Sequence, residues 1–207
     1  MPGAATVDTM YNDAYGGATE GYFGKVERKM WRCRRRAGWL AARSRRGRFL
    51  DVGCSGGFMT EAMRERDFET VGLDPDPISV AYAREHFPKN GFVVATAESF
   101  EPDGVPFDAV YCSEVIEHSA DVNRFVGAIA GVMAPGAVLF LTTPNIDHWR
   151  RPRELTAWDG FAPPSHCLYF NPRNLARLLA RHGLEVVTRR LAFKPGIKLL
   201  VRKAKGA

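Results

Sequence analysis

The sequence predicts an α/β fold in which helices cover both faces of one large sheet. Short apolar runs alternate with helical patterns from residue 47 onward. These runs are continuously apolar, as expected for parallel strands that crossover helices bury on both faces. The last two runs follow each other without an intervening helix, which indicates an antiparallel edge strand. Together these observations predict a doubly wound, Rossmann-like sheet of seven mostly parallel strands.

The seven predicted strands are short apolar segments bounded by polar or glycine-containing turns. In chain order they cover residues 47–53, 70–74, 92–96, 107–112, 134–143, 184–190 and 197–203. The fifth begins with the turn "APG" and is the most apolar.

Four helices are predicted between these strands. The first covers residues 58–66, and the third covers residues 121–133. The second begins at Asp76-Pro77 and the fourth at Asn171-Pro172, because an N-cap residue followed by proline is a typical helix start. We expect the second to end near His86 and the fourth near Gly183.

A basic segment precedes the sheet. Residues 25–48 read "KVERKMWRCRRRAGWLAARSRRGR". Apolar side chains recur at helical spacing from just before this segment, namely Phe23, Val26, Met30, Cys33, Ala37 and Leu40. This pattern predicts an amphipathic helix with an arginine-rich outer face. Such a face is either a solvated surface or a contact for an anionic substrate, an anionic membrane or RNA.

Two other segments are candidates for covering a substrate. Tyr11, Tyr15, Tyr22 and Phe23 precede the basic helix and either cover the substrate or pack loosely as a terminus. Residues 145–165 contain prolines, tryptophans and charges without a regular period, and we interpret this stretch as a lid.

The composition indicates a globular, intracellular protein. The chain has 207 residues, a formal net charge of +6, and no apolar run long enough to cross a bilayer. Its first residues do not resemble a signal peptide, and its four cysteines are scattered, which favours free thiols in the cytoplasm. The sequence predicts no oligomeric state.

The glycine-rich turn "LDVGCSGGFMTEAM" at residues 50–63 points to a nucleotide-like ligand. It has no lysine of a phosphate-binding P-loop, and Ser55 and Phe58 occupy positions where a dinucleotide fingerprint needs glycine. We expect the Asp51 carboxylate at the mouth of the turn, where it would repel phosphate but attract a cation. S-adenosylmethionine (SAM) fits, since it carries a sulfonium and an ammonium group and no phosphate.

A second acid supports this interpretation. Asp74 ends the next strand, where a carboxylate can accept hydrogen bonds from both hydroxyls of a ribose. Pro75 beside it offers an apolar surface for an adenine ring.

At this point the sequence resembles a known family. The segments "LDVGCSGG", "VGLDPDP", "FDAVYCSEVIEH" and "APGAVLFLTTPN" are similar to successive motifs of class I SAM-dependent methyltransferases, over roughly residues 49–187. The segment 163–187 is similar to a subgroup that includes ubiquinone-biosynthesis O-methyltransferases and natural-product methyltransferases.

The resemblance implies a role for each matching residue. Gly53, Cys54, Ser55 and Gly57 would surround the methionine half of SAM, and Asp74 would hold the ribose. Thr96 and Ala97 would border the adenine, and Ser113 would lie near the methionine end. Two positions depart from the family: Ser55 replaces a glycine, and Thr96 replaces an acid that often contacts the adenine amino group. Residues 47–207 would then form the SAM-binding domain, and residues 1–46 a substrate cover.

The stretch "SEVIEH" contains the candidate catalytic residues. If residues 114–118 form a first helical turn, Glu114, Glu117 and His118 share one face. His118, or His166 after the irregular loop, could act as general base. The four side chains could also hold Mg²⁺ or Mn²⁺, a set similar to the metal site of small-RNA 2′-O-methyltransferases. Alternatively, the acids only complement a helix dipole and the histidines only pack.

We therefore predict a SAM-dependent O-methyltransferase that acts on a small metabolite and releases S-adenosylhomocysteine. An anionic or lipid-linked metabolite is one candidate substrate. An RNA 2′-O-methyltransferase is the alternative, disfavoured because no RNA-binding module accompanies the basic helix. Methylation of a nitrogen or a carboxyl group, and a non-catalytic SAM-binding protein, are further alternatives. Peripheral membrane contact through the basic helix stays open.

Overall fold

The computed structural model describes residues 26–205. The predicted cover residues Tyr11, Tyr15, Tyr22 and Phe23 therefore lie outside the described residues. The strands are β1 (Arg48–Val52), β2 (Glu69–Asp74), β3 (Gly91–Val94), β4 (Phe107–Ser113), β5 (Met133–Pro144), β6 (Leu184–Arg189) and β7 (Gly196–Lys203). The helices are α3 (Val26–Ala41), α4 (Phe58–Arg64), α5 (Pro77–His86), α6 (Val122–Val132) and α7 (Pro172–Ala180), with 3-10 turns η1 (Ile116–His118) and η2 (Leu155–Ala157).

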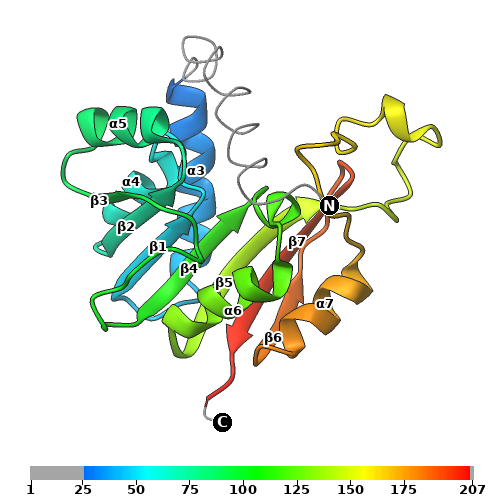
Figure 1. The fold of residues 1–207 in the computed structure, drawn as a ribbon. Helices are drawn as coiled ribbons and strands as arrows, with labels where there is room; N and C mark the ends of the chain where they lie inside the picture. Colours follow the sequence, from blue (N-terminus) through cyan, green and yellow to red (C-terminus); the bar gives the residue numbers. More distant parts are fainter. Residues whose placement is uncertain (1–25, 206–207) are drawn as a thin grey trace.

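The seven strands form one sheet in the order β3-β2-β1-β4-β5-β7-β6 (Figure 1). The pairs from β3 to β5 are parallel, whereas β7 is antiparallel to both β5 and β6. The predicted doubly wound sheet with an antiparallel pair at one side is confirmed. Within that pair the last strand of the chain is inserted beside β5, so β6 forms the edge.

The helix starts follow the capping signals of the sequence. Asp76 caps α5 by accepting hydrogen bonds from the backbone N–H groups of Ile78 and Ser79. Asn171 caps α7 in a reciprocal capping box with Asn174. Each cap satisfies backbone donors that have no partner inside the helix.

Two apolar layers enclose the sheet. Helices α6 and α7 cover one face, where Phe125, Ile129 and Leu175 pack against inward side chains of the strands. Helices α3 and α4 cover the opposite face, where Ala37 and Leu40 of α3 pack near Phe49 and Phe140. Figure 1 shows α3 behind the sheet and α6 and α7 in front of it.

The helix α3 ends at Ala41, one residue after Leu40, the last apolar residue of the predicted pattern, and β1 begins at Arg48. Met30, Ala37 and Leu40 are buried as expected, whereas Val26 is 42% exposed. Because α3 packs against α4, it belongs to the layer of helices that covers this face of the sheet.

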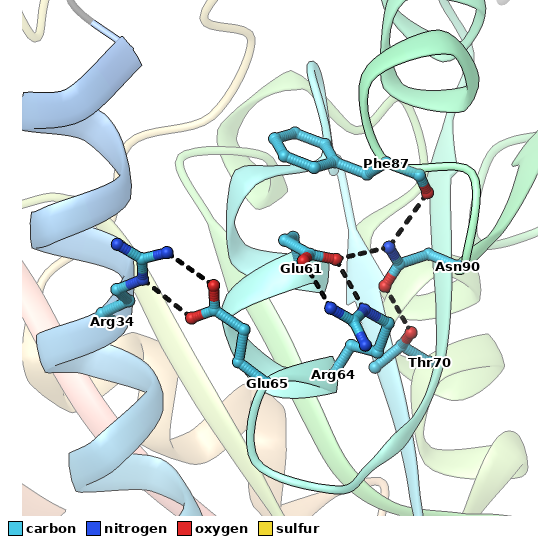
Figure 2. A network of polar contacts seen from close by, with 7 residues as sticks. All are labelled: Arg34, Glu61, Arg64, Glu65, Thr70, Phe87 and Asn90. Atoms are coloured by element: carbon cyan, nitrogen blue, oxygen red, sulfur yellow. Dashed lines mark hydrogen bonds and ion pairs between the residues drawn. The ribbon is translucent and has the colours of Figure 1, made fainter.

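A polar network accompanies this packing (Figure 2). Arg34 of α3 forms a bidentate pair with Glu65, with distances of 2.7 and 2.6 Å. Glu61 of α4 binds Arg64 and accepts a hydrogen bond from the Asn90 amide. Because these groups are partly exposed, we assign them a role in orienting α3 and α4 more than in stability.

All four cysteines are free thiols. Within residues 26–205, no helix combines the length and the apolar character that a membrane span requires.

Candidate cofactor and active site

The glycine-rich turn between β1 and α4 needs residues that tolerate positive φ. Gly53, Ser55 and Gly57 have φ values of 73°, 46° and 76°. The N–H groups of Gly53 and Cys54 both donate to the Leu73 carbonyl at 2.8 Å, which ties the turn to β2. A Cβ atom at Gly53 would lie 2.4 Å from Cγ2 of Val115, so only glycine fits there.

Asp74 joins this turn to the end of β2. Its Oδ2 accepts a hydrogen bond from the Ser55 N–H at 2.8 Å, and its Oδ1 accepts one from the Asp76 N–H at 3.0 Å. Burial raises the pKa of Asp74, and these two backbone donors oppose that rise. Each carboxylate oxygen keeps a second lone pair, so two more donors can bind.

A cavity of about 440 Å³ lies at the carboxyl ends of the parallel strands. The predicted residues that line it are Gly53, Asp74, Pro75, Thr96, Ala97 and His118. Its size is in the range of small-molecule and cofactor sites, and its position is where doubly wound folds bind ligands.

Asp51 does not lie at the mouth of the turn, so that prediction is wrong. The strand β1 continues to Val52, and Asp51 inside it is 1% exposed and does not line the cavity. Its Oδ2 accepts a hydrogen bond from Thr60 Oγ1 at 2.8 Å. Burial, which outweighs this hydrogen bond, raises the pKa of Asp51 to about 7.

Four other predicted binding residues also lie outside the lining of this cavity. Ser55 contributes its backbone N–H to Asp74 and no lining side chain. Cys54 is buried and packs with Val80, Ala83 and Phe92. Gly57 is the N-cap residue of α4, where it has a φ of 76° and forms no side-chain capping hydrogen bond. Ser113 ends β4 on the face covered by α3, and its Oγ lies 2.7 Å from Thr142 Oγ1.

The predicted first helical turn at residues 114–118 is wrong in its geometry. Glu114 has a left-handed φ of 59°, and only residues 116–118 form a 3-10 turn. Glu114 therefore leaves the face of Glu117 and His118, and its Oε1 accepts a hydrogen bond from Thr142 Oγ1 at 2.7 Å. Glu117 is 1% exposed; burial, followed by the nearby charge of Glu114, raises its pKa to about 8.

The structure brings His118 and His166 together, with ring centroids 4.8 Å apart. Nδ1 of His118 lies 2.7 Å from the Ser165 carbonyl oxygen, and Nδ1 of His166 lies 2.9 Å from that of Gly160. Because carbonyl oxygens only accept, both Nδ1 atoms carry protons and both Nε2 atoms offer lone pairs when the rings are neutral. Burial lowers the pKa of His118, which favours its neutral form.

Three of the four proposed metal ligands form a cluster. One ligand atom each from Glu117, His118 and His166 lie within 4.8 Å of one another, and Glu114 does not belong to this group. Oε2 of Glu117 accepts a hydrogen bond from Thr143, whereas the buried Oε1 has no hydrogen-bond partner among the described residues. An unpartnered buried carboxylate oxygen beside two oriented imidazoles fits a divalent cation.

The sequence did not single out several residues that line the large cavity, including Glu98, Val115, Asp121, Arg124 and Phe125. Glu98 follows Thr96 closely and supplies an acid near the position where the family has one, which is a signal that could have been read. The 145–165 segment contributes none of the lining residues. It reaches the site through the Ser165 carbonyl group, and its role as a lid stays a prediction.

Comparisons with known proteins agree with this geometry. A family model described as a methyltransferase domain matches residues 22–189. A ubiquinone biosynthesis O-methyltransferase of Bartonella tribocorum is 30% identical over 158 residues, which cover 68% of this chain and 61% of the relative. The matched segment thus spans between about two-fifths and three-fifths of the length of the curated relatives.

Two solved structures are similar in fold. The 1,6-didemethyltoxoflavin-N1-methyltransferase of Burkholderia thailandensis, solved with S-adenosylhomocysteine, has a TM-score of 0.72 at 17% identity and covers 97% of this chain and 88% of its own. The magnesium protoporphyrin IX methyltransferase of Synechocystis has a TM-score of 0.71 at 14% identity, with 98% and 100% covered.

Proposed function

This chain belongs to the methyltransferase domain family, and on that premise we propose that it transfers a methyl group from SAM to a hydroxyl group of a small metabolite. The convergence of Gly53, Asp74, Pro75, Thr96 and Ala97 on one cavity carries the proposal. Bound SAM supplies a methyl group on a positively charged sulfur, which is already a reactive donor.

The chain's own residues bind and orient this donor. The two free lone pairs of Asp74 would accept the ribose hydroxyls, while Ser55 and Asp76 hold the carboxylate in place. Pro75 and Ala97 would offer apolar walls to the adenine. The missing side chain of Gly53 lets the ligand approach the backbone closely.

The hydroxyl acceptor is supported by the relatives named O-methyltransferases and by the cluster at His118. Glu117, His118 and His166 would hold a divalent cation, and two imidazoles favour Mn²⁺ over Mg²⁺. Such an ion would lower the pKa of an acceptor hydroxyl. Without it, Nε2 of His118 would accept the acceptor's proton directly. The structural neighbour named an N1-methyltransferase has the same fold, so the fold alone does not choose the acceptor atom.

Calorimetric titration with S-adenosylhomocysteine tests the cofactor site. We expect micromolar binding and a loss of about tenfold to a hundredfold in Asp74→Ala, because a hydrogen-bonded carboxylate contributes about 1.5–3 kcal/mol. Asp74→Asn should lose less, since its amide keeps one acceptor. Asp67→Asn, an exposed carboxylate outside the site, is the control. Equal affinity in wild type and Asp74→Ala would refute the placement.

A second assay tests the reaction. Cell metabolites are incubated with the protein and SAM, and mass spectrometry searches for products that gain one methyl group. We expect chelation to abolish the gain and Mn²⁺ to restore it. Turnover that is unchanged by the chelator would exclude a metal requirement and leave His118 as the general base.

A further inference from the structure

A second cavity, of about 260 Å³, lies on the α3 side of the sheet. Five cationic side chains line it: Arg32, Arg35 and Arg36 of α3, Arg190 and Lys198. Thr142 lies among them, and Trp31, Phe140 and Leu191 supply apolar surface. Trp31 is 58% exposed and Leu191 78% exposed, so part of this apolar surface faces solvent.

The positive charges of this basic pocket are not neutralised within the described chain. Among residues 26–205, none of the five cations forms an ion pair, whereas Arg34 and Arg45 on the same segment pair with Glu65 and Asp108. Other arginines of this segment, such as Arg28 and Arg43, also form no ion pair among the described residues, so what sets the pocket apart is that five cations converge on one cavity. The basic pocket therefore differs from a surface that merely carries many charges.

Neutral contacts hold the guanidinium groups of the pocket. Arg36 Nη1 donates a hydrogen bond to the Tyr111 hydroxyl at 2.6 Å. Arg35 lies over the Trp31 ring at 4.8 Å, and Arg190 over the Trp39 ring at 4.6 Å. These contacts orient three of the five cations and leave their charges available.

The pKa of Lys198 reflects its burial and the positive charges around it. Burial, with the charges of Arg36 and Arg190, lowers the pKa of Lys198, and Glu114 acts in the opposite direction. Like charges around one cavity repel each other, and an anion inside it would relieve that repulsion.

A short chain segment links the basic pocket to the large cavity. Ser113, Thr142 and Lys198 are register partners on three neighbouring strands, so they form one row across the sheet. Ser113 Oγ and Thr142 Oγ1 are 2.7 Å apart. Val115, two residues after Ser113, lines the large cavity, so the segment 113–115 runs from the hydrogen-bond partner of Thr142 in the basic pocket to the lining of the large cavity.

We infer that the basic pocket binds a carboxylate or phosphate group of the methyl acceptor, with the apolar part of that molecule against Trp31, Phe140 and Leu191. This inference rests on the proposed function for its position beside the methyl donor. It names the substrate class: a small organic anion whose charged end is held by arginines while its acceptor atom faces the segment 113–115.

Backbone amide NMR titrations test the inference with three probes: inorganic pyrophosphate, benzoate and its neutral analogue benzamide. We expect both anions to shift the signals of residues 31–36 and 190–198, and benzamide to bind at least tenfold more weakly than benzoate. The double variant Arg32→Gln/Lys198→Gln should lose at least tenfold in affinity for the anions. Its own spectrum shows whether it is folded, and Arg190→Gln provides a second, milder variant.

The matched control is Arg45→Gln/Arg46→Gln, which removes the same charge from paired arginines outside the pocket. We expect it to bind the anions like wild type. Equal losses in both double variants, or equal affinity for benzoate and benzamide, would overturn the inference.

Two further arms separate the source of the anion and the proposed function. Phosphatidylcholine vesicles with phosphatidylglycerol that displace pyrophosphate would place the anion on a lipid headgroup, and vesicles that do not would place it on a soluble acceptor. Each sample is also titrated with S-adenosylhomocysteine. Binding of the cofactor without binding of the anion would overturn only the inference that the basic pocket is an anion site. Binding of the anion without binding of the cofactor would overturn only the proposed methyltransferase function.

Discussion

The buried carboxyl group of Asp51 predicts how the stability of this protein depends on pH. Its pKa is about 7 in the folded protein, against 3.8 for the ordinary side chain. Between these values the native state keeps a proton that the unfolded chain releases. The free energy of unfolding therefore falls as the pH rises through this window and levels off above pH 7.

The magnitude follows from the same two values. A difference of about three pKa units corresponds to about 4 kcal/mol in total, of which about 2.5 kcal/mol falls between pH 5 and pH 8. Asp51→Asn does not titrate, and its side-chain carbonyl can still accept the hydrogen bond from Thr60. We expect the variant to lack this 2.5 kcal/mol of pH-dependent loss.

Urea unfolding of the ligand-free protein at several pH values in this range is the assay. The difference between wild type and Asp51→Asn at each pH isolates Asp51 from the other titrating groups. Asp67→Asn replaces a carboxylate whose side chain is 79% exposed, and its pH profile should match that of wild type. Parallel profiles for wild type and Asp51→Asn would refute the assignment of a raised pKa to Asp51.

Three further predictions concern the turn, a helix cap and the cation cluster. Gly53→Ala places a methyl group against Val115 at a φ of 73°, and we expect a loss of about 2–3 kcal/mol and weaker S-adenosylhomocysteine binding, both visible in thermal shifts with and without the ligand. Asn171→Ala removes the capping box of α7 and should lower the free energy of unfolding by about 1 kcal/mol in urea titrations; no change would mean that the cap is dispensable. Glu117→Gln should weaken Mn²⁺ binding about tenfold or more by calorimetry while the affinity for S-adenosylhomocysteine stays the same. Equal Mn²⁺ affinities would exclude Glu117 as a ligand.

Local patterns in the sequence predicted most of the architecture. The N-caps Asp76 and Asn171, each followed by proline, gave the helix starts correctly, because capping depends on backbone groups two or three residues away. The position of Asp74 at the end of β2 followed from where the apolar run stops.

The errors occurred where distant segments decide the environment of a side chain. Asp51 was expected at the mouth of the turn, but α4 packs over the end of β1 and buries it beside Thr60. Glu114 was expected beside Glu117 and His118, but β5 supplies Thr142 as a partner and the backbone turns away. Thr142 lies 28 residues from Glu114, and Thr60, although only nine residues from Asp51, reaches it because α4 folds back against β1.

The sequence by itself determined the order of strands and helices, the tight turn after the first strand and the acid at the end of the second. These features depend on periodicity, capping and backbone freedom within a few residues. Only the tertiary structure decided that His166 lies against His118 and that arginines of α3 share a pocket with Lys198 of β7. Such neighbours meet because the strands pair in an order that differs from their order in the chain, and pairing between distant segments sets burial and charge at each site.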